Sequence, residues 1–173
     1  IQPQGGAWTV SGNLTSIVRL NGADRVTIDG LNTGGNALTI QNNSTAANTA
    51  AIWISSLGEN LGSENVSIKN TRIVGGSSTV TTAFGIHVGG TSISTTGTGA
   101  HNNNLTIQNN VFERAFYGLY ANGVLANMNQ NVNITNNTFG STVAGLEIGN
   151  RGIQIANSQN VLVESNTVYG FRN

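Results

Sequence analysis

Residues 104–112 read Asn-Leu-Thr-Ile-Gln-Asn-Asn-Val-Phe, and residues 131–139 repeat the phrase as Asn-Val-Asn-Ile-Thr-Asn-Asn-Thr-Phe. Apolar and polar side chains alternate in both copies, and a pair of asparagines follows. Alternation with a period of two is typical of a β-strand that buries one face, and asparagine favours a turn after it. Two more full copies begin at Asn65 and Asn160. The apolar residues that we expect to stack from copy to copy in one buried column are Ile68, Ile107, Ile134 and Val163.

A second strand pattern lies between the copies of the first: a small residue, then two apolar residues with one residue between them. Its first apolar positions, Ile52, Ile86, Leu119 and Ile153, advance by 34, 33 and 34 residues. Because each type of strand returns once per unit in the same register, the repeats favour a solenoid over a sandwich of hairpins with tight turns. No window keeps the apolar face of a helix. We expect an all-β solenoid of about five coils, with loops inserted at 91–103 and 124–130.

Composition excludes several classes of protein. Charged residues form 8% of the 173, the formal net charge is zero and Lys69 is the only lysine. The clustered positive charge that a nucleic-acid binder needs is therefore missing. No apolar run approaches the roughly 20 residues of a membrane-spanning helix, and the absence of cysteine removes disulfides, thiol catalysis and zinc–thiolate sites. We expect no nucleic-acid partner and no insertion into a membrane.

The repeated phrases Asn-Val-x-Ile-x-Asn-Asn-x-Phe and Gly-Ile-x-Val resemble the repeats of right-handed parallel β-helices of the pectate-lyase-like superfamily. Residues 20–31, Leu-Asn-Gly-Ala-Asp-Arg-Val-Thr-Ile-Asp-Gly-Leu, are similar to phrases in large secreted surface proteins of Bacteroidetes-type bacteria. The resemblance covers nearly the whole chain from Ser16 onward. It implies the fold and leaves the activity open, because the family contains lyases, hydrolases, adhesins and structural segments.

The abundant asparagines have a structural interpretation. They follow strands, where asparagine tolerates the left-handed backbone conformation of a sharp turn. In a stack of coils about 4.8 Å apart, their amides can hydrogen-bond along the axis as an asparagine ladder. A row of amides that binds a ligand is the alternative. The residues that we expect to form turns and ladder are Asn43, Asn70, Asn110, Asn137 and Asn166.

The acidic residues do not form the pattern of an enzyme. Glycoside hydrolysis needs two paired carboxylates, whereas the seven acids are scattered, with Asp24 and Asp29 a close pair. The resemblance implies Asn-Thr-Asp, Asp-Asp and Gly-His-Gly motifs for polygalacturonase-like members, and an acidic calcium cluster with a basic residue for lyase-like ones; the chain has none of these patterns. His87 and His101 have no sequence neighbour suited to a triad or a metal, so we expect both to be exposed. We expect no catalytic residue, no metal and no cofactor.

Three aromatic residues offer a carbohydrate-binding alternative. Strand alternation places Trp53 and Tyr120 opposite apolar neighbours, so that their side chains point outward, and Tyr117 is placed to do the same. Exposed aromatic faces are suited to stacking on sugar rings. Trp53, Tyr117 and Tyr120 are therefore candidate residues for binding surface glycans.

The sequence favours a structural function, as a β-helix segment of a bacterial extracellular surface protein, adhesin or self-assembling fibre. The alternative is a carbohydrate-binding or polysaccharide-cleaving domain of the lyase or hydrolase type. A polar, weakly charged surface favours secretion to the cell surface or medium. We interpret residues 1–173 as a single β-helix domain, either a segment of a longer chain or an uncapped fibre subunit, because neither end has a recognisable cap over its strand edges. With no net charge to repel copies, the expected self-association is end-to-end stacking.

Overall fold

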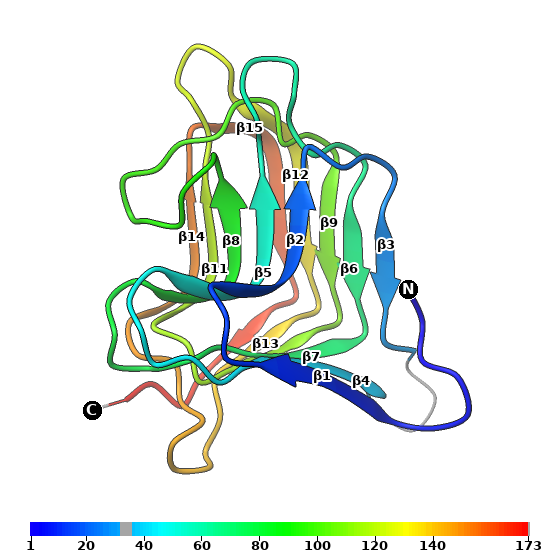
Figure 1. Ribbon diagram of the computed structural model, residues 1–173, viewed down its shortest axis with the longest axis vertical. Helices are drawn as coiled ribbons and strands as arrows, with labels where there is room; N and C mark the ends of the chain where they lie inside the picture. Colours follow the sequence, from blue (N-terminus) through cyan, green and yellow to red (C-terminus); the bar gives the residue numbers. More distant parts are fainter. Residues whose placement is uncertain (32–35, 173) are drawn as a thin grey trace.

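Three strands per turn wind the chain into a parallel β-helix of about five turns in the computed structural model (Figure 1). The structure describes residues 1–31 and 36–172. Every pairing between neighbouring strands of the three sheets is parallel, because each strand pairs with the equivalent strand one turn away. The predicted all-β solenoid is confirmed. Within the described ranges, no helix is long and apolar enough to cross a membrane.

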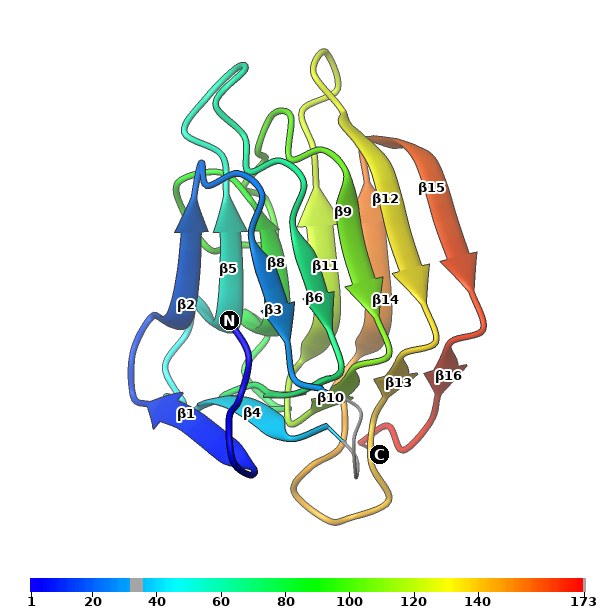
Figure 2. The same cartoon turned by 90° about the vertical axis from the view of Figure 1, so that its right-hand side faces the viewer.

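The three sheets, here called A, B and C, follow one another around each turn. Figure 2 shows the strands of sheet C side by side in their order along the chain. Sheet A contains β1 (Trp8–Gly12), β4 (Leu38–Asn42), β7 (Thr71–Val74), β10 (Val111–Glu113), β13 (Thr138–Phe139) and β16 (Thr167–Val168). Sheet B contains β2 (Ser16–Asn21), β5 (Thr49–Ser55), β8 (Ala83–Gly89), β11 (Tyr117–Asn122) and β14 (Arg151–Ala156). Sheet C contains β3 (Thr27–Asp29), β6 (Ser67–Lys69), β9 (Leu105–Gln108), β12 (Asn129–Thr135) and β15 (Ser158–Glu164).

Apolar columns fill the space between the sheets, in the register that the repeats predict. In sheet C, Ile68, Ile107 and Ile134 lie opposite one another and are buried, and Val163 completes the column. Val163 itself is 50% exposed, because β15 is the last strand of its sheet. In sheet A, the rings of Phe112 and Phe139 stack with their centroids 4.4 Å apart. The repeat anchors of sheet B, Ile52, Ile86, Leu119 and Ile153, form a third column.

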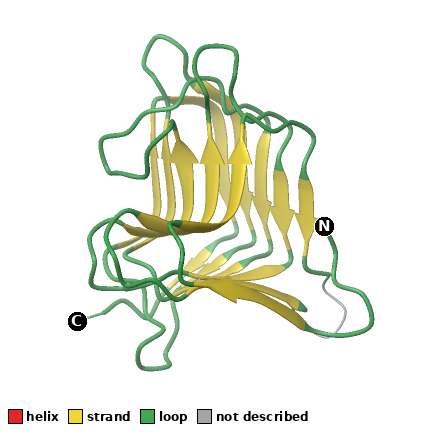
Figure 3. Cartoon of the chain, viewed as in Figure 1, coloured by secondary structure: helices red, strands yellow, loops and turns green. Residues whose placement is uncertain are grey.

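Loops of different lengths interrupt the turns, and Figure 3 shows them at the ends of the strands, where the chain passes from one sheet to the next. The loops after β8 and β11 occupy residues 90–104 and 123–128, close to the predicted 91–103 and 124–130; residues 129–130 belong instead to β12. A longer loop than the repeats suggest, residues 140–150, follows β13.

Both ends of the described solenoid expose apolar side chains. At one end Trp8 is 58% and Val10 48% exposed, and at the other Val168 is 46% exposed. The N-terminal residue partly covers the first end, because the amino group of Ile1 donates to the Thr27 carbonyl at 2.7 Å and its carbonyl accepts from the Asp29 N–H at 2.9 Å. Ile1 thereby pairs with the outer edge of β3.

Candidate functional site

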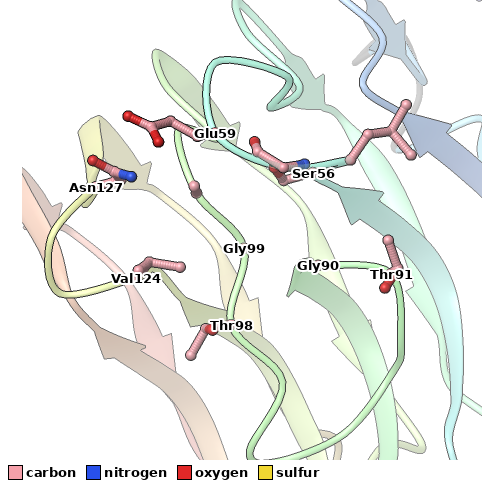
Figure 4. Close-up of a pocket in the computed structure, with 11 residues that line it drawn as sticks. Ser56, Glu59, Gly90, Thr91, Thr98, Gly99, Val124 and Asn127 are labelled. Carbon is pink, nitrogen blue, oxygen red and sulfur yellow. The ribbon is translucent and has the colours of Figure 1, made fainter.

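Three loops that lead from sheet B to sheet C form a cleft at the corner between these sheets (Figure 4). They follow β5, β8 and β11, so they lie on successive turns although they are far apart in the sequence. The cleft has a volume of about 310 Å³. Its lining residues are Ser56, Leu57, Gly58, Glu59, Gly90, Thr91, Thr98, Gly99, Ala100, Val124 and Asn127.

The chemistry of the cleft is polar and nearly neutral. Glu59 supplies its one charged side chain, and hydroxyl and amide groups come from Ser56, Thr91, Thr98 and Asn127. Ser56 shapes the first loop, since its Oγ donates to the Gly58 carbonyl at 2.8 Å and accepts from the Gly58 N–H at 3.1 Å. The arrangement offers hydrogen-bond donors and acceptors to a polar ligand. Nothing in the repeat pattern indicated it, because all of its residues lie in the irregular loops.

A cluster of aromatic side chains covers the outer surface of sheet B beside this cleft. The outward column of Trp53, His87 and Tyr120 runs across β5, β8 and β11. Phe84 and Tyr117 form the neighbouring column, with rings stacked at 5.5 Å. The three candidate glycan-binding residues therefore belong to one cluster.

A loop covers this cluster. The segment 90–99, here called the covering loop, brings Ile93 onto the aromatic rings, and Tyr120 Oη donates to the Thr95 carbonyl at 2.5 Å. Trp53 is 6% and Tyr120 3% exposed, while Tyr117 is half-buried. In this conformation a sugar ring has no access to the faces of Trp53 and Tyr120. Their role in glycan binding stays a prediction.

The expectation that His87 is exposed is wrong. Its side chain does point away from the interior of the solenoid, but the covering loop buries it completely. Its Nε2 lies 3.0 Å from the Ser94 carbonyl and 3.3 Å from the Ser94 N–H, and its Nδ1 has no hydrogen-bond partner among the described residues. Burial lowers the pKa of His87 to about 4, against a smaller opposing effect of its hydrogen bond to Ser94. His101 is half-buried, and its Nδ1 accepts from the Asn60 N–H at 3.0 Å.

An asparagine ladder lies inside the solenoid between sheets C and A. Asn110 and Asn137 are buried and Asn166 is half-buried. The Asn137 Oδ1 accepts from the Asn110 N–H at 2.9 Å, and the Asn166 Oδ1 accepts from the Asn137 N–H at 2.9 Å. The amide groups donate in return to strand carbonyls of the preceding turn, Asn110 to Ile68 and Asn137 to Ile107. Each of these side chains thus joins two turns.

The two members of an asparagine pair have different tasks. The first member, Asn109 or Asn136, has the left-handed conformation, with φ of 55° or 56°, and the second turns inward to the ladder. Asn70 is also left-handed and belongs to an outer row, in which its Nδ2 donates to Asp29 at 2.7 Å and its Oδ1 accepts from Asn109 at 2.6 Å. Asn43 lies in neither row: it is exposed after β4, and its Oδ1 accepts from Gln41 and Arg114.

Sequence reasoning missed a second inner row, at the corner between sheets B and C. Asn102 and Asn129 are fully buried there. The Asn102 Oδ1 accepts from the Ser63 N–H at 3.0 Å, and the Asn129 Oδ1 accepts from the Asn102 N–H at 3.1 Å. These residues follow loops of unequal length, but each lies two residues before an Asn-apolar-x-apolar phrase, which begins at Asn104 or at Asn131. That fixed position is the signal that could have found them.

Asp24 and Asp29 are engaged in structural contacts. Asp29 forms an ion pair with Lys69 at 3.3 Å and accepts from Asn70 and Leu31. Burial raises the pKa of Asp29, but these hydrogen bonds and the lysine charge outweigh it and leave the pKa below the ordinary value. The Asp24 carboxylate accepts from the Glu64 N–H at 2.9 Å. Among the residues that the structure describes, no three His, Asp or Glu side chains converge in a way that could hold a metal ion.

Comparison with known proteins yields no match, whether to a protein-family model, to a curated protein or to a solved structure.

Proposed function

We propose that the chain is a structural β-helix segment of a bacterial extracellular surface protein, adhesin or self-assembling fibre. The observation that carries this proposal is that asparagine, the most abundant polar residue, serves to hold the turns together. Asparagines at both corners of sheet C join one turn to the next through buried amide groups, which leaves them unavailable to a ligand. In the row between sheets C and A, the buried amides of Asn110 and Asn137 both donate and accept, and buried polar groups satisfied in this way specify one arrangement of the chain. The sparse charge and polar surface favour the extracellular location.

Self-association through the ends of the solenoid belongs to this proposal. Unpaired strand edges next to exposed apolar side chains favour pairing with another chain. Val161 and Val163 are 38% and 50% exposed at the β15 edge, and β3 has the matching edge at the opposite end. Because Ile1 pairs with β3, stacking requires the N-terminal residues to leave that edge.

Sedimentation velocity and electron microscopy over a range of concentrations test the stacking. We expect fibres one solenoid wide, and we expect Val163→Lys to prevent them, because it places a charge against the next turn. Leu162→Lys is the matched control: Leu162 is 46% exposed on the outer side of the same strand, so its charge faces solvent. Removal of residues 1–6 should promote assembly. Strictly monomeric particles of both the full and the shortened chain would contradict the stacking.

The cleft at the corner between sheets B and C favours carbohydrate binding as a second candidate function. Its hydroxyl and amide groups and single carboxylate match the neutral, hydroxyl-rich surface of a saccharide, and its volume suits one or two sugar rings. Binding on a glycan array that is lost in Glu59→Gln and Asn127→Ala, but kept in the control Glu147→Gln outside the cleft, would support it. Release of reducing sugars from polygalacturonate would instead favour the polysaccharide-cleaving alternative. If the chain binds no glycan and cleaves no polyuronate, the structural function is the one candidate that remains.

A further inference from the structure

The covering loop contacts sheet B mainly through side chains. Within the described residues, its backbone-to-backbone hydrogen bond to the rest of the chain lies at its last residue, where the Gly99 N–H donates to the Asn122 carbonyl. Just before the loop, the carbonyl of Gly89 in β8 accepts from the Ser56 N–H. Between these ends the loop is attached by the buried side chain of Ile93 and by polar contacts of Ser94 and Thr95 with His87 and Tyr120. A segment with few backbone contacts opens at low cost compared with a strand.

The surface beneath the loop is continuous and aromatic. The rings of His87 and Tyr120 lie nearly parallel, 5.5 Å apart, and Phe84 meets both rings edge-on. Trp53 extends the column on β5, where the guanidinium of Arg19 lies 3.9 Å from its ring centroid. An open loop would expose an apolar strip that crosses three strands.

The surroundings of His87 disfavour a positive charge. No Asp or Glu occurs in β5, β8, β11 or the covering loop, the elements that enclose it. The charged residues of the neighbouring strands β2 and β14 are Arg19 and Arg151, both cationic. The titratable groups in the cluster itself are the phenols of Tyr117 and Tyr120. A protonated His87 would therefore be buried without an anion, and its second ring N–H would lack an acceptor.

We propose that the covering loop is a lid that opens in acid and uncovers the aromatic strip of Trp53, His87 and Tyr120. With the Nε2–H donating to the Ser94 carbonyl, protonation of the imidazole adds an Nδ1–H and places an unpaired charge under the loop. Opening hydrates that charge while the strands, held by their own ladders, stay in place. This inference does not depend on the proposed structural function.

The size of the effect follows from proton linkage. The pKa of His87 is about 4 under the closed loop and the ordinary 6.5 in the open state. The ratio of open to closed molecules therefore rises about tenfold for each unit by which the pH falls between 6.5 and 4. Over the whole window the ratio rises about 300-fold. Above pH 6.5 the imidazole is neutral in both states and has no effect on the loop.

Tryptophan fluorescence provides the test, because the chain has two tryptophans, of which Trp53 is buried and Trp8 is exposed on the first turn of the solenoid. In a Trp8→Phe background, iodide quenching reports on Trp53 alone. We expect quenching to rise severalfold as the pH falls from 7 to 4, with far-UV circular dichroism unchanged. His87→Gln, which keeps a hydrogen-bonding group near Ser94 without a titrating ring, should remain closed over this range. In Ile93→Ser, the apolar contact of the lid is weaker, so the lid should open at a higher pH than in the protein with Ile93.

Three results would overturn the proposal. The first is Trp53 shielded down to pH 3 in a folded protein. The second is equal acid exposure of Trp53 in His87→Gln. The third is loss of circular dichroism together with the exposure, because the opening would then be global unfolding and not the movement of a lid.

Discussion

At the scale of single residues, the asparagine pairs show how one residue type performs two tasks at adjacent positions. The first asparagine adopts a positive φ that side chains other than asparagine and aspartate adopt at a cost, and this reverses the chain sharply. The reversal points the next side chain into the solenoid, where its amide meets the turns on either side. The pair is therefore a turn residue followed by a bridging residue.

Asn137→Ala tests the bridging residue. The substitution removes the acceptor of the Asn110 N–H and the donor to the Ile107 carbonyl, both of which are buried. We expect the free energy of unfolding, measured by urea denaturation, to fall by about 1–3 kcal/mol. Asn133→Thr, at a half-buried outward position of β12, the strand that precedes Asn137, is the control and should change stability little. Equal effects of the two substitutions would show that the ladder adds nothing.

Asn136→Ala tests the turn residue. Asn136 is exposed with φ of 56°, so alanine there introduces backbone strain without loss of buried contacts. We expect a loss of about 1 kcal/mol. Asn136→Gly should be nearly neutral, since glycine adopts this conformation freely. The comparison of the two midpoints in urea separates strain from the loss of the side chain.

At the scale of the strand, the apolar columns make the turns interdependent. Ile107 in β9 is buried between Ile68 and Ile134, so its side chain contacts the turns before and after it. Ile107→Ala should lower the free energy of unfolding by about 2–5 kcal/mol through lost burial and the cavity that remains. Gln108→Ala, at the exposed next position of β9, is the control. An unchanged unfolding midpoint for Ile107→Ala would contradict the column.

The strands could be predicted from the sequence because period-two alternation and equal spacing are local signals. The column of Ile68, Ile107 and Ile134 follows directly from them. The burial of His87 could not, because it depends on a loop whose only large apolar residue is Ile93. Alternation correctly placed His87 and Trp53 on the outer side of their strands, but which segment covers that side is decided by the path of an irregular loop.

At the scale of the whole molecule, His87 and Asp29 predict how stability depends on pH. A histidine with a depressed pKa leaves stability unchanged above its unfolded pKa of 6.5 and lowers it as the pH falls toward about 4. The expected loss reaches up to about 3 kcal/mol. Asp29, whose pKa is also lowered, contributes stability above its ordinary value of 3.8 and loses it as the pH falls further.

Thermal unfolding measured at a series of pH values checks both windows. The wild-type melting temperature should fall between pH 6.5 and 4, whereas that of His87→Gln should stay level there. Below pH 3.8 the two proteins should fall together as Asp29 is protonated, and Asp29→Asn should remove part of that second decline. A wild-type curve that is level from pH 7 to 4 would contradict the burial of a neutral His87.

The axial direction of the hydrogen bonds has a mechanical consequence. The ladders of the three sheets and the asparagine rows all run along the solenoid, whereas the covalent chain runs around it. A tensile load between the two ends therefore acts on one turn at a time, as in unzipping, and never on several strands in shear. Each turn that opens releases a length of chain equal to one repeat, which varies from 27 to 40 residues between successive anchors Ile28, Ile68, Ile107, Ile134 and Val163. Under tension the molecule would lengthen in steps of unequal size and dissipate a sudden pull.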